Sequence, residues 1–133
     1  MSIILIIEDD QTICELYSTV LKEHVILQAT NSNDAIEAAI EHQPDLILTD
    51  LCVPDNNGFF PKQNHTFEFL KNLRKADSKA KIIVCSGLCY DQQMQKSVLG
   101  AGADFSLPKT GSIKALKKAV DHALNTYAVS NIA

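Results

Sequence analysis

The sequence has no tryptophan, no long apolar run and no cysteine pair spaced as C-x-x-C. A helix that spans a membrane needs about 20 apolar residues, whereas the apolar run at the start of the chain stops after residue 7 at an acidic triplet. A signal peptide needs a basic start and a longer apolar stretch. We therefore expect a cytoplasmic protein that makes no contact with a membrane.

The sequence also lacks an excess of basic residues. Its 12 basic and 16 acidic residues give a formal net charge of −4. Proteins that bind nucleic acid through phosphate contacts need a basic face, so we expect no nucleic-acid partner. The spacing of the four cysteines does not suit a zinc site, and we expect reduced, mostly structural thiols; they are Cys14, Cys52, Cys85 and Cys89.

The length and composition are those of one globular domain. The chain has 133 residues, of which 46% are hydrophobic and 21% are charged. We predict a single domain over residues 1–133, with a core at 3–127 and a short C-terminal tail at 128–133. This length leaves no room for a separate output domain, so we expect output through contact with another protein.

Short, dense apolar runs alternate with helical patterns along the chain. The runs predict strands that are buried on both faces, as in a parallel sheet, at residues 3–7, 25–29, 46–49, 81–85 and 103–107. The intervening segments have apolar residues at helical spacing, with a capping box at Thr12 and Glu15 for the first helix. We expect the third helix at 66–75, the fourth at 91–99 and the fifth from 112 to about 127. The alternation predicts an α/β fold of the (βα)₅ type. Its doubly wound, parallel, five-stranded sheet would have the flavodoxin-like order 2-1-3-4-5, with helices on both faces.

The predicted strands end at residues that suit phosphoryl chemistry. Glu8 and Asp9 follow the first strand, Asp50 the third, Ser86 the fourth and Lys109 the fifth. The carboxyl ends of parallel strands share one edge of the sheet, so we expect these side chains to converge. Clustered carboxylates repel one another, and Mg²⁺, which binds carboxylates, waters and phosphate oxygens, would remove that conflict. Aspartate can act as a nucleophile, so the set fits phosphoryl transfer to Asp50, with Lys109 and Ser86 balancing charge.

Each of these residues also has an ordinary structural explanation when it is taken alone. The acidic triplet at 8–10 suits the start of a helix, and Asp50 suits a turn. Ser86 and Lys109 suit a turn and a surface position. Their occurrence together at four strand ends favours the functional interpretation.

The chain resembles the receiver domain of two-component response regulators (CheY-like) over residues 3 to about 127. Four motifs carry the resemblance, in this order: ILIIEDD (4–10), LILTDLCVPDNNG (46–58), IIVCSG (82–87) and GADFSLPK (102–109). The resemblance implies that Asp50 is the phosphoacceptor and a ligand of Mg²⁺. It further implies that Asp9 binds the metal directly, Glu8 through water, and Cys52 through its main-chain carbonyl. Ser86 would be the switch hydroxyl, and Lys109 the ion-pair partner.

The sequence departs from the family pattern near its end. The family often has an aromatic switch residue three positions before the lysine, where this chain has Ser106, with Phe105 one residue earlier. These two residues and Gly87 are therefore the candidate switch or partner residues. The family often has a cis-proline after the lysine, where this chain has Thr110.

Residues from about 59 to 65 look like an insertion between the turn at Gly58 and the third helix. Surface loops accept insertions at low entropic cost, so a tolerated insertion is one interpretation. A cover for the site and a partner-binding element are the others.

These observations predict a phosphoacceptor of a two-component system or phosphorelay. A sensor histidine kinase or a histidine phosphotransferase would phosphorylate Asp50 in the presence of Mg²⁺, which would change contacts with an unidentified downstream protein. The chain would not be an enzyme, although it would assist its own phosphorylation and dephosphorylation. The main alternative is a degenerate receiver that acts as a phosphorylation-independent interaction module.

Two further alternatives have less support from the sequence. An aspartyl-phosphate hydrolase typically has a D-x-D motif after a strand, whereas here Cys52 occupies the position of the second aspartate. A flavodoxin-like FMN carrier needs hydroxyls and backbone donors after the first strand, where this chain has the acidic triplet.

Overall fold

The structure is a computed structural model that describes residues 2–62, 65, 67–87, 92–109 and 112–132, with side chains up to residue 125 in the last helix. Strands and helices alternate within these ranges. Their bounds are β1 (Ile3–Ile7), α1 (Gln11–Val20), β2 (Val25–Ala29), α2 (Ser32–His42), β3 (Leu46–Thr49), α3 (Glu68–Ala76), β4 (Lys81–Ser86), α4 (Gln92–Gly100), β5 (Phe105–Pro108) and α5 (Ile113–Ile132). No helix among the described residues is both long enough and apolar enough to cross a membrane.

The strands form one five-stranded parallel sheet in the order β2-β1-β3-β4-β5. Parallel neighbours need crossover connections, and the helices supply them. The predicted fold class and strand order are therefore confirmed. The register aligns Ile7 with Ala29 and Thr49, and it aligns Ser86 with Pro108. The strands consequently end close to the same edge, where the predicted site lies.

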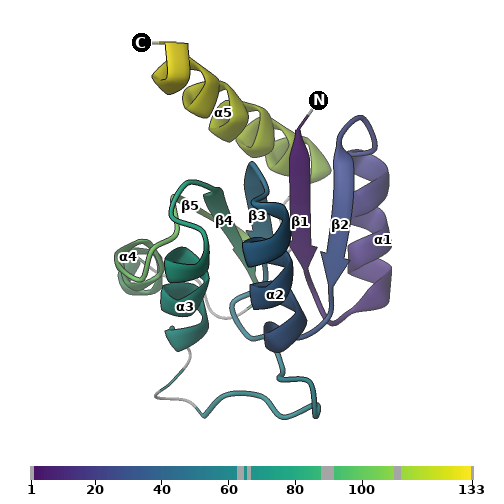
Figure 1. Ribbon diagram of the computed structural model, residues 1–133, viewed down its shortest axis with the longest axis vertical. Coiled ribbons are helices and arrows are strands. Elements are labelled where there is room, and N and C mark those ends of the chain that lie inside the picture. Colours follow the sequence, from purple (N-terminus) through teal and green to yellow (C-terminus); the bar gives the residue numbers. More distant parts are fainter. Residues whose placement is uncertain (1, 63–64, 66, 88–91, 110–111, 133) are drawn as a thin grey trace.

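Apolar clusters cover both faces of the sheet, because successive side chains of a strand point to opposite faces. Leu5 and Ile7 belong to a cluster completed by α2, α3 and α4. Ile4 and Ile6 belong to a second cluster, completed by α1 and α5. Figure 1 shows α2 and α3 next to each other over one face of the sheet, and these two helices are in contact.

The predicted capping box of the first helix is wrong. The helix begins one residue before Thr12, and Asp10 is its cap, with Oδ1 accepting hydrogen bonds from the N–H groups of Thr12 at 2.9 Å and Ile13 at 3.3 Å. The aspartate just before the helix is a strong N-cap residue in its own right. Because Asp10 already satisfies these donors, Thr12 and Glu15 are not needed as a box.

Other boundaries differ from the sequence prediction at the ends of elements. β5 starts at Phe105 instead of residue 103, since Gly102 turns the chain with φ +124° and the Asp104 carboxylate accepts the Ile82 N–H at 2.9 Å. β4 is one residue longer and ends at Ser86. α3 starts at Glu68, and α4 spans 92–100, with residue 91 outside the described residues.

The segment at 128–132, which was expected to be a tail, continues α5 to Ile132. It contains neither glycine nor proline, the residues that most readily end a helix.

Candidate functional site

The ends of β1 and β3 place two carboxylates next to each other. The Glu8 N–H donates to the Ala29 carbonyl at 3.1 Å, and the Asp50 N–H donates to the Ile7 carbonyl at 3.1 Å. These bonds extend the sheet by one residue beyond each strand, so the backbone at both acidic residues is fixed. Glu8 is 1% exposed, an unusual position for an ionisable side chain unless it is paired.

Lys109 joins these two carboxylates. Its Nζ lies 3.0 Å from Glu8 Oε1 and 2.9 Å from Asp50 Oδ2. The backbone holds the lysine in place, because the Lys109 N–H donates to the Ser86 carbonyl at 2.8 Å. The other oxygen of Asp50, Oδ1, accepts the Leu51 N–H at 2.7 Å. The structure thus brings together residues from three strand ends, as the sequence predicted.

The electrostatics of this group follow from burial and pairing. Burial raises the pKa of Glu8 above its ordinary value, which outweighs the lowering by the hydrogen bond from Lys109. Burial acts to lower the pKa of Lys109, but hydrogen bonds with Asp50 and Glu8 outweigh it and raise that pKa. The lysine is therefore a permanent positive charge at neutral pH, fixed between two acidic side chains.

Asp9 completes an acidic group that could hold a divalent cation. Carboxylate oxygens of Glu8, Asp9 and Asp50 all lie within 4.8 Å of one another, with Asp9 exposed and Asp50 half-buried. These are hard oxygen ligands, the kind that Mg²⁺ takes from proteins, and they leave room for waters on the exposed side. The donor set therefore fits the predicted metal.

Asp10 contributes to the site through a contact that the sequence motifs do not predict. Its N–H donates to Glu8 Oε1 at 3.2 Å while its side chain caps α1. The helix start and the acidic group are thus fixed by the same residue. The signal was present in the sequence, since an aspartate just before a helix is a strong N-cap residue.

Ser86 and Gly87 lie at the end of β4, the strand between β3 and β5 in the sheet. Ser86 is 1% exposed. A β-carbon added to Gly87 would lie 3.6 Å from Cδ of Lys109, which is ordinary packing distance. The small residue at 87 therefore lies against the stem of the lysine. Thr110, singled out for the missing cis-proline, lies outside the described residues.

The switch candidates on β5 occupy different faces of the sheet. Phe105 packs against the cluster under α1 and α5, and its ring meets that of His122 edge-on, with centroids 5.6 Å apart. Ser106 is half-buried, and it is the next residue in the strand, so its side chain points to the other face. Cys52, whose main-chain carbonyl was predicted to bind the metal, is half-buried two residues after Asp50.

An apolar surface borders the lysine on the side of α1 and α5. Leu16 and Ile113 are 43% and 48% exposed, and they line a cavity of about 90 Å³ together with Tyr17 and Lys109. Exposed apolar side chains next to a polar site are typical of surfaces that bind another protein.

Comparison with known proteins identifies the family. The family model described as the response regulator receiver domain matches residues 4–121. The chain is similar to the chemotaxis protein CheY of Bacillus subtilis (strain 168), with 28% identity over 125 residues, 92% of this chain and 97% of the relative. It is also similar to the KDP operon transcriptional regulatory protein KdpE of Escherichia coli (strain K12), with 32% identity over 98% of this chain and 54% of that protein.

Solved structures agree on the fold. The signal receiver domain of the putative Luxo repressor protein from Vibrio parahaemolyticus has a TM-score of 0.84 at 21% identity, and the match covers 98% of this chain and 95% of that one. The chain belongs to the response regulator receiver domain family.

Proposed function

We propose that this receiver domain accepts a phosphoryl group on Asp50 from a phosphohistidine, in the presence of Mg²⁺. Receiver domains of response regulators interact with histidine kinases and with downstream effectors, so the donor would be a sensor histidine kinase or a histidine phosphotransferase. The observation that carries the proposal is the Lys109 bridge. It holds Asp50 at 2.9 Å within an acidic group that suits a divalent cation.

In the proposed reaction, an Asp50 oxygen attacks phosphorus, the new O–P bond forms, and the P–N bond to the donor imidazole breaks. The departing imidazole nitrogen takes up a proton from water. Mg²⁺ would be held by Glu8, Asp9, Asp50 and the Cys52 carbonyl. When bound, it would supply positive charge to the phosphoryl oxygens. The Leu51 N–H at Asp50 Oδ1 and the lysine at Oδ2 orient the carboxylate. Most of the catalysis would thus be positioning by the domain itself.

Phosphorylation would change the charge at Asp50 from −1 to about −1.5 to −2. Lys109 would then contact a phosphoryl oxygen instead of Asp50 Oδ2. The Ser86 hydroxyl would contact another phosphoryl oxygen. Ser86 ends β4 and Lys109 directly follows β5, so the new contacts would shift the backbone at these two strand ends between two states. The readout would be altered binding of a downstream protein.

The donor protein would approach over the apolar surface formed by Leu16 and Ile113. Lys109 lines the same cavity, so a protein that covers these side chains would bring its phosphohistidine next to the acidic group. Burial of exposed apolar side chains would supply part of the binding free energy.

The test is incubation with acetyl phosphate and Mg²⁺, followed by intact-mass measurement. We expect the mass of one phosphoryl group to appear and to disappear on mild alkaline treatment. Asp50→Asn should abolish the gain, whereas the matched variant Asp55→Asn should keep it, because that residue lies in the same loop but outside the acidic group. Absence of the gain in the unaltered protein would contradict the proposal.

The degenerate-receiver alternative has support from β5. The position of the usual aromatic switch is Ser106, and the neighbouring Phe105 packs against His122 under α5. A module of this kind would bind its partner with the same affinity before and after treatment with beryllofluoride and Mg²⁺. Under the phosphoacceptor proposal, that treatment changes the affinity.

A further inference from the structure

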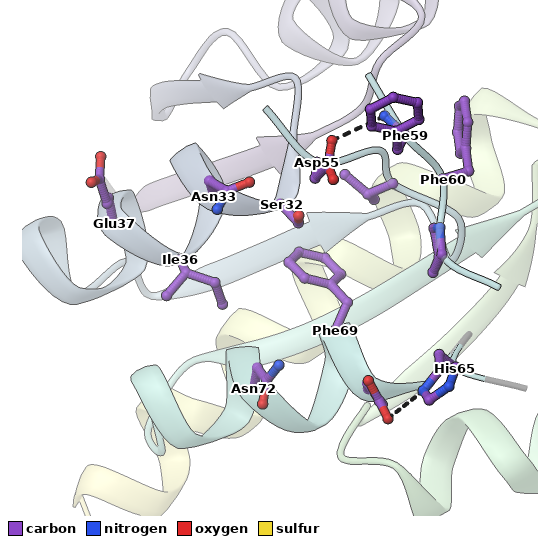
Figure 2. A pocket seen from close by; sticks show the side chains of 13 residues that line it. Ser32, Asn33, Ile36, Glu37, Asp55, Phe59, Phe60, His65, Phe69 and Asn72 are labelled. Carbon is purple, nitrogen blue, oxygen red and sulfur yellow. Dashed lines mark hydrogen bonds and ion pairs between the residues drawn. The ribbon is translucent and has the colours of Figure 1, made fainter. Parts of the chain in front are cut away.

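A groove lies on the face of the molecule that carries α2 and α3, and no residue of the acidic group lines it. It has a volume of about 540 Å³, and its walls are α2, α3 and the segment that follows β3. Ile36, Val53 and Phe69 give it an apolar floor, and Val53 and Phe69 are 3% and 9% exposed. Figure 2 shows Phe69 in the middle of the lining residues, with Glu37 at one side.

One wall of the groove is unusually exposed and apolar. Phe59 and Phe60 are 72% and 56% exposed, although both line the groove with Pro61. These residues belong to the segment that looked like an insertion in the sequence. Adjacent phenylalanines that face solvent are typical of a surface that binds a partner.

The polar lining of the groove is acidic. It contains Glu37, Asp55 and Glu68, and no lysine or arginine lines it among the described residues. Asp55 Oδ1 accepts from the N–H of Phe59 at 3.0 Å, and Glu68 lies 2.6 Å from Nδ1 of His65. Glu37 is exposed and has no hydrogen-bond or ion-pair partner in the part of the chain that the structure describes. The groove therefore combines negative charge with aromatic rings, both of which attract cations.

The aromatic wall is fixed to α2 by the backbone of the loop after β3. The Ser32 N–H donates to the Pro54 carbonyl at 2.8 Å, and the Asn56 N–H donates to Asn33 Oδ1 at 2.9 Å. Gly58, with φ +87°, turns the chain back so that the Asp55 N–H reaches the Phe59 carbonyl at 2.9 Å. The groove is thus formed before any ligand binds, which reduces the entropy lost on binding.

We propose that this groove binds a segment of a partner protein that carries a basic side chain next to an apolar one. Figure 2 shows Glu37 and the two phenylalanine rings at opposite ends of the lining, so one basic side chain of the segment would pair with Glu37 and another would lie against the rings. The apolar side chain would cover the floor at Phe69. A protein segment fits better than a small molecule, because pockets for small molecules enclose most of their ligand, whereas this aromatic wall projects into solvent. The inference does not depend on phosphorylation of Asp50.

The probe for the test is a fluorescein-labelled twelve-residue peptide. Every second residue is glycine, and the positions between are arginine and leucine in turn. Two control peptides replace either every arginine with glutamate or every leucine with serine. Binding is measured by fluorescence anisotropy and mapped by changes in backbone amide NMR signals. We expect saturable binding with a dissociation constant below about 1 mM, weaker binding as salt rises, and shifted signals at Asn33, Phe60 and Asn72. Both control peptides should bind at least about fivefold more weakly.

Matched variants separate the groove from general charge effects. Glu37→Lys and Phe60→Ser should each weaken probe binding about fivefold or more. Glu15→Lys makes the same change in net charge on α1, under the other face of the sheet, and should leave binding within about twofold. Ile40→Ser replaces an apolar residue of similar exposure, 58%, that does not line the groove. It should also bind normally.

Several results would overturn the inference. One is the absence of saturable binding up to about 1 mM probe. Another is binding of the glutamate peptide with the same affinity as the arginine probe. A third is a shift of amide signals around β5 and α5 instead of the groove. Concentration-dependent dimerisation that Phe60→Ser abolishes would identify a second copy of the chain as the occupant and would equally contradict it. All variants alter exposed side chains, and circular dichroism verifies their folding.

Discussion

Replacement of Lys109 by methionine should destabilise the domain in a pH-dependent way. The lysine side chain is 19% exposed and contacts Glu8 and Asp50, whose side chains are 2% and 12% exposed. Removing one member of a buried ion pair costs about 3–5 kcal/mol, because the remaining charge stays buried without a partner. Glu8 can take up a proton and relieve part of that cost. We therefore expect a loss of about 3 kcal/mol in unfolding free energy near pH 8.

The sign of the pH dependence follows from Glu8. Its pKa in the folded protein is already above the ordinary value of 4.5, because burial opposes the charged form. The folded state therefore binds this proton more tightly than the unfolded chain, and stability falls as pH rises above the ordinary value. Without the lysine the pKa rises further, so the fall continues to higher pH. The loss in Lys109→Met should shrink to about 1 kcal/mol near pH 5.

The assay is urea unfolding followed by far-ultraviolet circular dichroism, because the chain has no tryptophan to report by fluorescence. Lys118→Met removes an exposed lysine from α5 and should change stability by no more than about 0.5 kcal/mol at either pH. A loss below about 1 kcal/mol near pH 8, or an equal loss at both pH values, would refute the ion-pair reasoning.

Three further predictions concern other parts of the fold. Arg74→Lys should lower the free energy of unfolding by about 2 kcal/mol, measured in urea. The guanidinium donates to the carbonyls of Ala80 and Gly102 at 2.6 to 3.1 Å, and an ammonium lacks that fork of donors. An unchanged urea midpoint would show that the fork is unimportant. Gly58→Ala should lower the free energy of unfolding by about 1 kcal/mol, because φ at this residue is +87°. Gly100→Ala, in open space on a helix, should not destabilise the domain. Equal effects of the two variants on the urea midpoint would exclude backbone strain as the cause. Burial raises the pKa of the Cys85 thiol to about 12, so iodoacetamide near pH 8 should modify half-buried Cys52 faster than Cys85, as judged by peptide mass mapping, and equal rates at these two thiols would contradict this.

The fold could be predicted largely from the apolar pattern. Strands of a doubly covered parallel sheet are apolar along most of their length, and the buried runs in β1, β3 and β4 follow this pattern. The edge strand β5 is half-buried, so its apolar pattern is weaker and predicts a start two residues before the observed one at Phe105. The helix starts were less predictable, because Asp10 and Thr12 are both good cap residues and only the backbone geometry selects between them.

The candidate site was predictable because parallel topology converts strand ends into one location. Glu8, Asp50 and Lys109 are far apart in the sequence, but a single rule about strand ends brings them together. The groove could not be predicted in this way. It depends on how far the segment from Phe59 projects and on contacts such as Asn56 to Asn33, which join side chain and backbone across 23 residues. No periodic pattern encodes such contacts.

Chemical trapping shows directly whether Asp50 accepts the phosphoryl group. The protein is treated with acetyl phosphate and Mg²⁺ and then with sodium borohydride, which reduces an acyl phosphate to an alcohol and leaves free carboxylates intact. Tandem mass spectrometry of the digest then locates the alcohol. We expect the alcohol at Asp50 only, and we expect the signal to be lost when Mg²⁺ is chelated or when Lys109 is replaced by methionine. Trapping at Asp9 or Asp55, or no trapping at all, would contradict this expectation.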